Sequence, residues 1–341
     1  MLKHRITAAI LFAVLAVLLL PGCTGIKFTT GLSKGEFAKC GDMVISTDIS
    51  DLLLAEQKYS YENLFNNNVW SENIGNMTME EYVADSVKNT VANLIYLNII
   101  ADELRIVLTD EEKRKVSEAA SEYSAMSEGI SEETVQEIYT LILSAEKAFY
   151  AMTDDVDTEV SNDEARIISV QYVFISTMVK NEDGTISAVS ESEYNRAKRL
   201  AEEIHKAAKN GSDMISLATE KSSDSIYSME LGRGQYNKEF ENVAFDLEMG
   251  EISDVVETEY GFYVIKCIND NIESNIAKRK AEIVLGRRRE IFLEKYEKYI
   301  EKNDIMFNKK YLKNIDIKSI QSGNGKIFEV YNNNFVSTQV K

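Results

Sequence analysis

The sequence predicts an α+β protein, in which a small antiparallel sheet with packed helices is inserted in a mostly helical domain. Two apolar runs rich in β-branched and aromatic residues, Ile167–Thr177 and Phe262–Ile268, have the composition of buried strands. The segments 36–163 and 270–317, which flank this central part, carry apolar residues at helical spacing instead. A chain of 341 residues is long enough for two such domains.

The first residues have the pattern of a secretory signal peptide, which is predicted to span residues 1–22. A basic start with Lys3 and Arg5 precedes the apolar run Ile6–Leu20. The Leu-Pro-Gly-Cys that ends this region resembles a bacterial lipobox, in which cleavage falls before the cysteine and its sulfur receives a lipid. We therefore expect Cys23 to be lipidated and the protein to be extracytoplasmic, anchored through its lipid to the bacterial cell membrane. The alternative, a transmembrane anchor, needs about 20 apolar residues, and this run is shorter.

Net charge and the scarcity of histidine limit the kinds of functional site that the chain can contain. The formal charge of −18 argues against nucleic-acid binding, because an acidic surface repels a phosphate backbone. Apart from the signal peptide the chain holds only His205, so no metal site, cofactor or histidine-based triad is predicted. The acidic run 154–163 lacks the ligand order and glycine of an EF-hand, so we interpret it as a solvated linker. Whether Cys40 and Cys267 pair is left open by the sequence.

The segment before the central runs is predicted to be mostly helical. Residues 23–35 are small and polar, and we interpret them as the lipidated cysteine and a tether. The N-terminal helical segment 36–163 follows, with a short strand expected within Glu36–Ser46. Trp70, the only tryptophan, is interpreted as a core residue packed on a neighbouring helix. Three helix starts are marked by N-terminal capping patterns, at Thr78, Thr109 and Ser131.

The central domain is predicted to span residues 164–269. A glycine-marked turn at Asn181–Gly184 is the expected tip of an insertion. Besides the two apolar runs, a further strand is expected at Ile252–Val256, so the predicted order is one strand, three helices and two strands. The three predicted helices start at Ser190, Ser212 and Lys238.

After the central domain the helical period returns. One long helix is expected from Ile272 to about Lys302 within the segment 270–317, although Gly286 inside it costs about 1 kcal/mol. The last segment, residues 318–341, is treated as a tail. Its two alternating runs around an asparagine cluster leave open a hairpin or a disordered end.

Several motifs of the central domain occur together in a recognisable order. They are Ser-Ser-Asp at 222–224, Leu-Gly at 231–232, Phe-Glu-x-x-Ala-Phe at 240–245, and a run ending in Tyr-Gly-Phe-Tyr-Val-Ile-Lys at 260–266. In this order they resemble the parvulin (PpiC, rotamase) family of peptidyl-prolyl isomerases. The whole chain resembles the PrsA/SurA type of secretion foldase, in which the flanking helices form a chaperone domain and the segment 270–317 returns to pack on it.

The resemblance implies a site for the proline ring of a substrate. Leu231, Tyr236 and Phe240 match the positions that form the prolyl cup, and Tyr236 stands where the family often has methionine. Thr258 and Tyr260 match the loop beside the site. From the residues alone, Leu231 and Phe240 are equally explained as core residues.

The resemblance also implies the polar part of the site. Asp224 matches the acid that lies beside the twisting carbonyl group, although by itself it is also typical of a turn or a helix cap. The family usually has two histidines hydrogen-bonded to each other, one in the first strand and one in the last. Here they align with Tyr172 and Tyr263, whose ordinary pKa lies near ~10 rather than ~6.5.

The predicted function is that of a membrane-anchored foldase that assists secreted proteins and isomerises their X-Pro bonds. Its expected partners are unfolded or secreted client proteins and, through the N-terminal lipid, the membrane, without nucleic acid; a homodimer is left open. The alternative is a non-catalytic holdase chaperone with a degenerate parvulin domain. A solute-binding lipoprotein would need repeated βαβ units, which the sequence lacks.

Overall fold

The computed structural model describes residues 26–65 and 67–335 of the chain. The predicted signal peptide, residues 1–22, and the lipidation candidate Cys23 lie outside the described residues. No helix in the described part is long and apolar enough to cross a membrane. Helices alternate with small, mainly antiparallel sheets, so the α+β fold class is confirmed.

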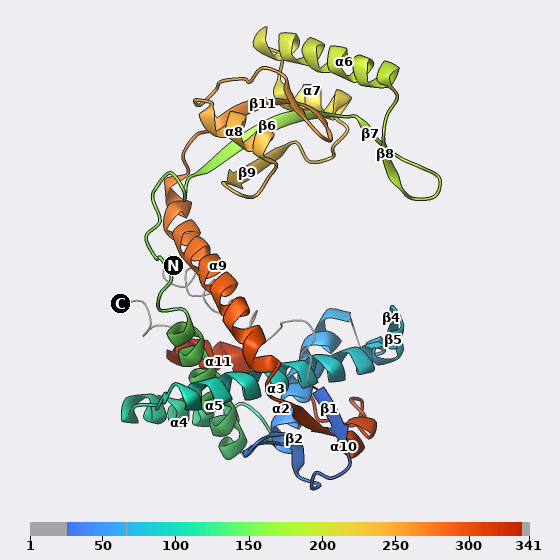
Figure 1. Ribbon diagram of the computed structural model, residues 1–341. Coiled ribbons are helices and arrows are strands. Elements are labelled where there is room, and N and C mark those ends of the chain that lie inside the picture. The colour runs from blue at the N-terminus through green and yellow to red at the C-terminus, as the bar shows by residue number, and fades with distance from the viewer. Residues whose placement is uncertain (1–25, 66, 336–341) are drawn as a thin grey trace. The chain divides into compact units, whose positions relative to one another are not determined.

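The described chain divides into two compact units, whose elements are shown in Figure 1. Unit 1 combines residues 26–157 with residues 284–335. Unit 2 is the continuous stretch 158–283. Each unit has hydrophobic clusters of its own, and each is described below by itself.

Four long helices form most of unit 1, and two of them start at confirmed capping boxes. The hydroxyl groups of Thr78 and Thr109 accept hydrogen bonds from the backbone N–H groups of Glu81 and Glu112, each at 3.2 Å. Both glutamates in turn accept from the N–H of their cap residue. These bonds satisfy donors that a helix start leaves unpaired. The helices are α2 (Thr47–Phe65), α3 (Met79–Glu103), α4 (Asp110–Ser124) and α5 (Glu132–Met152).

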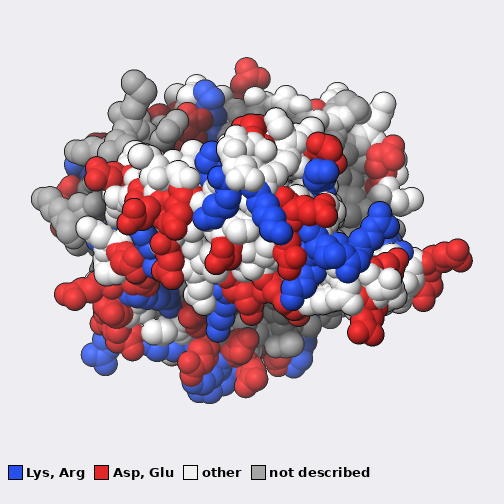
Figure 2. Space-filling model, turned by 90° about the horizontal axis from the view of Figure 1, so that it is seen from above, with Lys and Arg blue, Asp and Glu red and all other residues white. Residues whose placement is uncertain are grey.

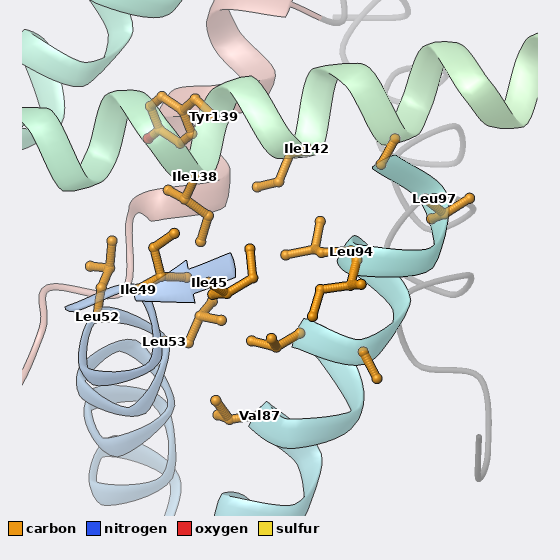
Figure 3. Packing of buried hydrophobic residues seen from close by; sticks show 14 of the residues in the cluster. Ile45, Ile49, Leu52, Leu53, Val87, Leu94, Leu97, Ile138, Tyr139 and Ile142 are labelled. Carbon is orange, nitrogen blue, oxygen red and sulfur yellow. The ribbon is translucent and has the colours of Figure 1, made fainter. Parts of the chain in front are cut away.

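The core of unit 1 lies where three of these helices meet. Trp70, in the 3-10 helix η1 (Val69–Ser71), is buried and meets the ring of Tyr61 edge-on at 6.2 Å, which confirms its interpretation as a core residue. A short hairpin of β4 (Asn73–Ile74) and β5 (Met77–Thr78) leads from it into α3. Figure 3 shows apolar side chains from α2, α3, α5 and the neighbouring strand pointing into one space: Ile45, Ile49, Leu53, Val87, Leu94, Ile138 and Ile142.

A four-stranded sheet in unit 1 joins both ends of the chain. Its order is β1-β12-β2-β3, with β1 parallel to β12. The prediction of a tether over residues 23–35 is wrong at residues 26–29, because β12 offers an edge of unpaired N–H and C=O groups that this stretch satisfies. The strands are β1 (Ile26–Thr29), β2 (Glu36–Cys40), β3 (Met43–Ser46) and β12 (Ile305–Asn308).

The C-terminal tail is not a hairpin in its described part. It contains helix α11 (Ile327–Phe335), which follows the short helix α10 (Lys309–Lys313). The alternating pattern misled the prediction, because the apolar residues also fit helical spacing. Their burial in the core of unit 1 selects the helix. The buried residues of α11 are Ile327, Val330, Tyr331 and Phe335.

A buried carboxylate binds this C-terminal segment to the rest of unit 1 through hydrogen bonds. Glu56 of α2 accepts hydrogen bonds from the hydroxyl of Tyr123 at 2.7 Å and from the backbone N–H groups of Asn324 at 3.0 Å and Ile327 at 3.1 Å. Burying a carboxylate is costly unless such donors surround it. The tail is therefore part of the folded unit.

Unit 2 is built on a four-stranded antiparallel sheet of order β10-β11-β6-β9. Side chains alternate between its faces, so one face carries the cluster around α8 and the other the cluster under α6 and α7. A separate hairpin, β7 (Met178–Lys180) with β8 (Ile186–Ala188), has the predicted turn Asn181–Gly184 at its tip. The other elements are β6 (Ile167–Ser176), α6 (Glu191–Lys209), α7 (Met214–Lys221), β9 (Ser228–Gly232), α8 (Lys238–Asp246), β10 (Val256–Thr258) and β11 (Gly261–Asn269).

Three local predictions for unit 2 need correction. Strand β9 was not predicted, because its few residues include glutamate and methionine rather than a β-branched run. The strand expected at Ile252–Val256 begins only at Val256, since Ile252 makes a single bridge to Lys266. Helix α7 is capped by Asp213 rather than Ser212, because the carboxylate accepts from the N–H of Ser216 at 2.8 Å.

The long helix predicted after the central domain is confirmed as α9 (Glu273–Ile300), which begins in unit 2 and ends in unit 1. Its last turns belong to the core of unit 1, where Phe292 and Tyr296 are buried. The hydroxyl of Tyr296 donates to Asn93 Oδ1 at 2.8 Å. Gly286 lies within this helix, as the sequence predicts.

Two glycines of unit 1 give a matched test of this packing. A Cβ added at Gly323 would meet Glu56 Oε1 at 2.1 Å, whereas one added at Gly286 would meet nothing within 4 Å. We expect Gly323→Ala to lower the free energy of unfolding of unit 1 by about 1–3 kcal/mol, through overpacking against a fixed carboxylate. Gly286→Ala should raise it by about 0.5–1 kcal/mol, because alanine favours the helix. Urea unfolding followed by Trp70 fluorescence measures both, and an unchanged midpoint for Gly323→Ala would contradict the docking of the tail.

Candidate active site

The two central strands of unit 2 place an aromatic group on the face covered by α8. In β6 and β11 the paired residues include Tyr263 with Phe174 and Ile265 with Tyr172. The ring centroids of Tyr172 and Tyr263 lie 5.8 Å apart, and the ring of Phe174 stacks on Tyr263 at 4.4 Å. These side chains share one face because residues two apart on a strand point the same way. The structure thus brings the two tyrosines together although 90 positions of sequence separate them.

A tight loop after α7 carries Asp224 to this group. The N–H of Ser223 donates to Phe174 O at 2.7 Å, and the hydroxyl of Ser222 accepts from the N–H of Phe174 at 3.2 Å and of Asp224 at 3.2 Å. The loop is therefore fastened to β6. The hydroxyl of Tyr172 then donates to Asp224 Oδ2 at 2.9 Å. The other carboxylate oxygen accepts from the N–H of Ile226 at 3.1 Å, so Asp224 is at once a turn residue and the partner of a phenol.

The three residues expected to form a prolyl cup lie in the same cluster but differ in exposure. Phe240 is 0% exposed and Leu231 is 2% exposed, so both are core residues in this structure. The ring of Phe240 lies 5.0 Å from that of Tyr263 and 4.7 Å from that of Tyr236. Tyr236 is half-buried. Of these three residues, Tyr236 is therefore the one with an accessible ring surface.

The two residues expected on the loop beside the site lie between β10 and β11. The hydroxyl of Thr258 donates to Gly261 O at 3.0 Å and accepts from the N–H of Tyr260, so it holds the turn. A Cβ at Gly261, whose φ is 147°, would meet Ile175 O at 2.1 Å, so this close approach requires glycine. Tyr260 is 47% exposed, so it is available to a ligand while Thr258 has a structural role.

Burial governs the protonation of the paired tyrosines. Burial, and then the hydrogen bond to Asp224, raise the pKa of Tyr172 well above its usual value. Burial, and then a hydrogen bond with Tyr236, raise the pKa of Tyr263 in the same direction. Both side chains are therefore neutral across the physiological pH range, and Tyr172 donates to Asp224. The arrangement offers neutral donors, one carboxylate and an aromatic wall, and within the described residues no group of three or more His, Cys, Asp or Glu is placed to hold a metal ion.

Three residues near the site were not singled out from the sequence. Phe174 stacks on Tyr263, and its spacing of two from Tyr172 on a strand was a signal for it. Ile226, just after Asp224, is exposed despite its apolar side chain. Glu241 of α8 is buried and binds two backbone N–H groups of the loop that carries Tyr236. It belongs to the Phe-Glu-x-x-Ala-Phe motif, but the motif does not reveal its burial, and Glu239 of the same helix is exposed.

Comparison with known proteins agrees with this geometry. Residues 177–269 match the family model of the PPIC-type PPIase domain, or rotamase. This range includes Asp224, Tyr236 and Tyr263 but begins after Tyr172, which the pairing of β6 with β11 brings to the site. The chain therefore carries a PPIC-type peptidyl-prolyl isomerase domain within unit 2.

The similarity to characterised proteins extends over both units. The chain is 26% identical over 247 residues to foldase protein PrsA 3 of Bacillus cereus, covering 64% of this chain and 80% of the relative. It is 22% identical over 315 residues to foldase protein PrsA of Caldanaerobacter subterraneus, covering 86% of this chain and 95% of that protein. The solved structure of PrsA from Bacillus cereus aligns with a TM-score of 0.35 at 19% identity, covering 77% of this chain and 99% of that one. By sequence, the chain is similar to PrsA foldases over most of its length.

The raised pKa of Tyr172 predicts how the stability of unit 2 depends on pH. Because the folded-state pKa lies above the unfolded value near ~10, the stabilisation is complete below about pH 10 and is lost as pH rises towards the folded value. Tyr172→Phe removes this group, so the free energy of unfolding should fall less steeply above about pH 10, by up to about 1.4 kcal/mol per pH unit.

Urea unfolding between about pH 8 and 12, followed by near-ultraviolet circular dichroism, measures this slope. Trp70 lies in unit 1, so its fluorescence transition serves as the control and should not differ between the two proteins. Equal slopes for wild type and Tyr172→Phe in the dichroism signal would show that this phenol ionises as freely in the folded state as in the unfolded chain.

Proposed function

We propose that the protein is a lipid-anchored, extracytoplasmic foldase for secreted proteins, and that unit 2 catalyses the cis–trans isomerisation of their X-Pro bonds through Asp224, Tyr172 and Tyr263. The PPIC-type domain supports the class of activity, and the similarity to PrsA foldases supports the cellular role. The observation that carries the residue assignment is the hydrogen bond between Tyr172 and Asp224, at the edge of a buried aromatic cluster.

The barrier to be lowered is that of an amide bond with partial double-bond character, about 18–20 kcal/mol. In the planar amide the carbonyl oxygen carries extra negative charge, which decreases as the bond twists and conjugation is lost. A carboxylate near that oxygen therefore raises the energy of the planar form relative to the twisted one. Asp224 takes this role, and Tyr172 keeps its carboxylate oriented by donating to Oδ2. No covalent intermediate is required.

The aromatic residues supply the second part of the mechanism. Tyr236 and Tyr260 present partly exposed rings that bind the proline ring and the adjacent chain. The phenol of Tyr263 lies within the cluster and stays uncharged, because burial raises its pKa. Removing water from the twisting amide strengthens each of these interactions. Two neutral phenols thus take the place that the family usually gives to two histidines.

The chaperone role is assigned to the protein as a whole. On the face shown in Figure 2, Asp and Glu side chains are widely spread among Lys and Arg, in keeping with the net charge of −18. Such a surface disfavours nucleic acids. Membrane attachment is assigned to the proposed lipid on Cys23.

A second candidate function is that of a holdase, whose unit 2 binds peptides without isomerising their X-Pro bonds. The observation in its favour is the burial of Phe240 and Leu231, which leaves no open cup of aromatic and aliphatic surface. The two candidates differ in turnover, because only the first accelerates isomerisation of a bound X-Pro peptide.

Substitution of the proposed carboxylate tests the catalytic assignment. We expect Asp224→Ala to reduce kcat/KM for a proline tetrapeptide by at least about tenfold, which corresponds to about 1.4 kcal/mol of transition-state stabilisation. Glu220→Ala is the matched control, because Glu220 is exposed and forms an ion pair with Lys221, away from the aromatic cluster. Exchange NMR of the peptide measures the rate. A wild-type protein that gives no acceleration but suppresses client aggregation would establish the holdase instead.

The anchoring proposal has its own test. Cys23→Ala removes the sulfur that would carry the lipid, so we expect the protein to leave the membrane fraction and to lose labelling by a fatty-acid analogue. Cys40→Ala is the control, because Cys40 is a buried thiol within a strand. Fractionation of cells that produce each variant checks the outcome. Membrane association that persists in Cys23→Ala would mean that something other than the lipid holds the protein there.

A further inference from the structure

The loop between β9 and α8 is held by a buried glutamate. Glu241 is 9% exposed, and its two carboxylate oxygens accept separate backbone hydrogen bonds. The N–H of Gly234 donates to Oε2 at 2.9 Å and the N–H of Tyr236 donates to Oε1 at 2.6 Å. A third bond runs within the loop, from the N–H of Gly232 to Gln235 Oε1 at 2.7 Å.

Burial separates Glu241 from the other glutamate of helix α8. Glu239, nearby in the sequence on the same helix, is exposed. A buried carboxylate loses its hydration, and the loss is offset here by two charge-assisted bonds to amides. The position near the start of α8 adds the favourable field of the helix N-terminus. Gly234 has a φ of 78°, a backbone conformation that glycine adopts without strain, so the loop curls around the carboxylate.

The residue that this loop presents lies at the centre of the site. The ring of Tyr236 is 4.7 Å from that of Phe240 and 6.3 Å from that of Tyr263. Tyr236 therefore packs against the same aromatic cluster in which the hydroxyl of Tyr172 donates to Asp224, and its ring lies against the buried Phe240.

We propose that Glu241 is the positioning residue of this site, and that it acts through Tyr236 by holding the loop 232–237 in the conformation that accepts an X-Pro peptide. The inference rests on the proposed isomerase function. Without Glu241 the loop populates other conformations, and the peptide binds only the fraction of molecules in which Tyr236 is in place. The apparent affinity falls by that fraction, while turnover of the bound peptide is retained. Loss of Asp224 has the opposite signature, because it lowers kcat.

The kinetic test uses the full-length chain in detergent and the tetrapeptide Ala-Ala-Pro-Phe, followed by exchange NMR. We expect Glu241→Ala to raise KM by about tenfold or more with kcat within about twofold of wild type. Glu241→Gln should give an intermediate KM, because an amide has one acceptor oxygen for two N–H donors. Glu239→Ala is the matched control and should equal wild type. A lower kcat with unchanged KM in Glu241→Ala would indicate a loss of folded protein and overturn the proposal.

Coupling to Tyr236 gives a second criterion. If Glu241 acts through this tyrosine, adding Glu241→Ala to Tyr236→Ala should not raise KM further, although each single change does. A double variant whose KM increase equals the product of the two single increases would contradict the proposal. Such independence would mean that Glu241 does not act through Tyr236.

Hydrogen exchange of the amides separates this inference from the isomerase function. In the wild type, the amides of Gly234 and Tyr236 should be protected, and in Glu241→Ala they should exchange about a hundredfold faster while the amides of β6 are unchanged. If the wild-type protein is inactive, the isomerase proposal fails. The amide exchange rates of Gly234 and Tyr236, together with the Kd of the same peptide, still test whether Glu241 positions the loop. Unchanged exchange of the two amides would overturn it.

Discussion

The antiparallel pairing of β6 with β11 is the constraint on which the rest of unit 2 depends. These strands lie in the middle of the sheet, and the alternation of their side chains gives each face a different content. Val173 and Val264 pack under α6 and α7, while Tyr172 and Tyr263 face α8. A slip of one residue would exchange the two sets. The register therefore fixes the fold and the aromatic site together.

Buried carboxylates perform a related task throughout the chain. Glu56 binds backbone amides of the C-terminal segment, Glu146 accepts from the hydroxyl of Tyr331 at 2.8 Å, and Glu241 binds the loop of the site. Glu56 and Glu241 fix backbone segments by hydrogen bonds to an ion that the core has removed from water, and Glu146 adds a polar bond to the apolar packing of α11. Precise placement of Tyr236 thus depends on a polar contact rather than on hydrophobic packing.

The features predicted correctly from the sequence are those that a local pattern of residues determines. Apolar periodicity located the long helices, the capping boxes located two of their starts, and the motifs around Asp224 and Phe240 predicted the PPIC-type domain. Strand β1 and helix α11 were missed because each is selected by a partner far away in the sequence, an edge of β12 and the core of unit 1. Glu241 was missed for the same reason. Its role comes from the backbone amides that it binds, which the Phe-Glu-x-x-Ala-Phe motif around it does not reveal.

The central claim is that the tyrosine cluster recognises proline itself. NMR of the protein with carbon-13 in its tyrosine rings tests this directly, by titration with an Ala-Ala-Pro-Phe peptide and with Ala-Ala-Ala-Phe as the matched ligand. The account predicts that the proline peptide shifts the signals of Tyr236, Tyr263 and Tyr172, whereas the alanine peptide leaves them in place. Equal shifts with both peptides, or shifts confined to tyrosines of unit 1, would contradict it.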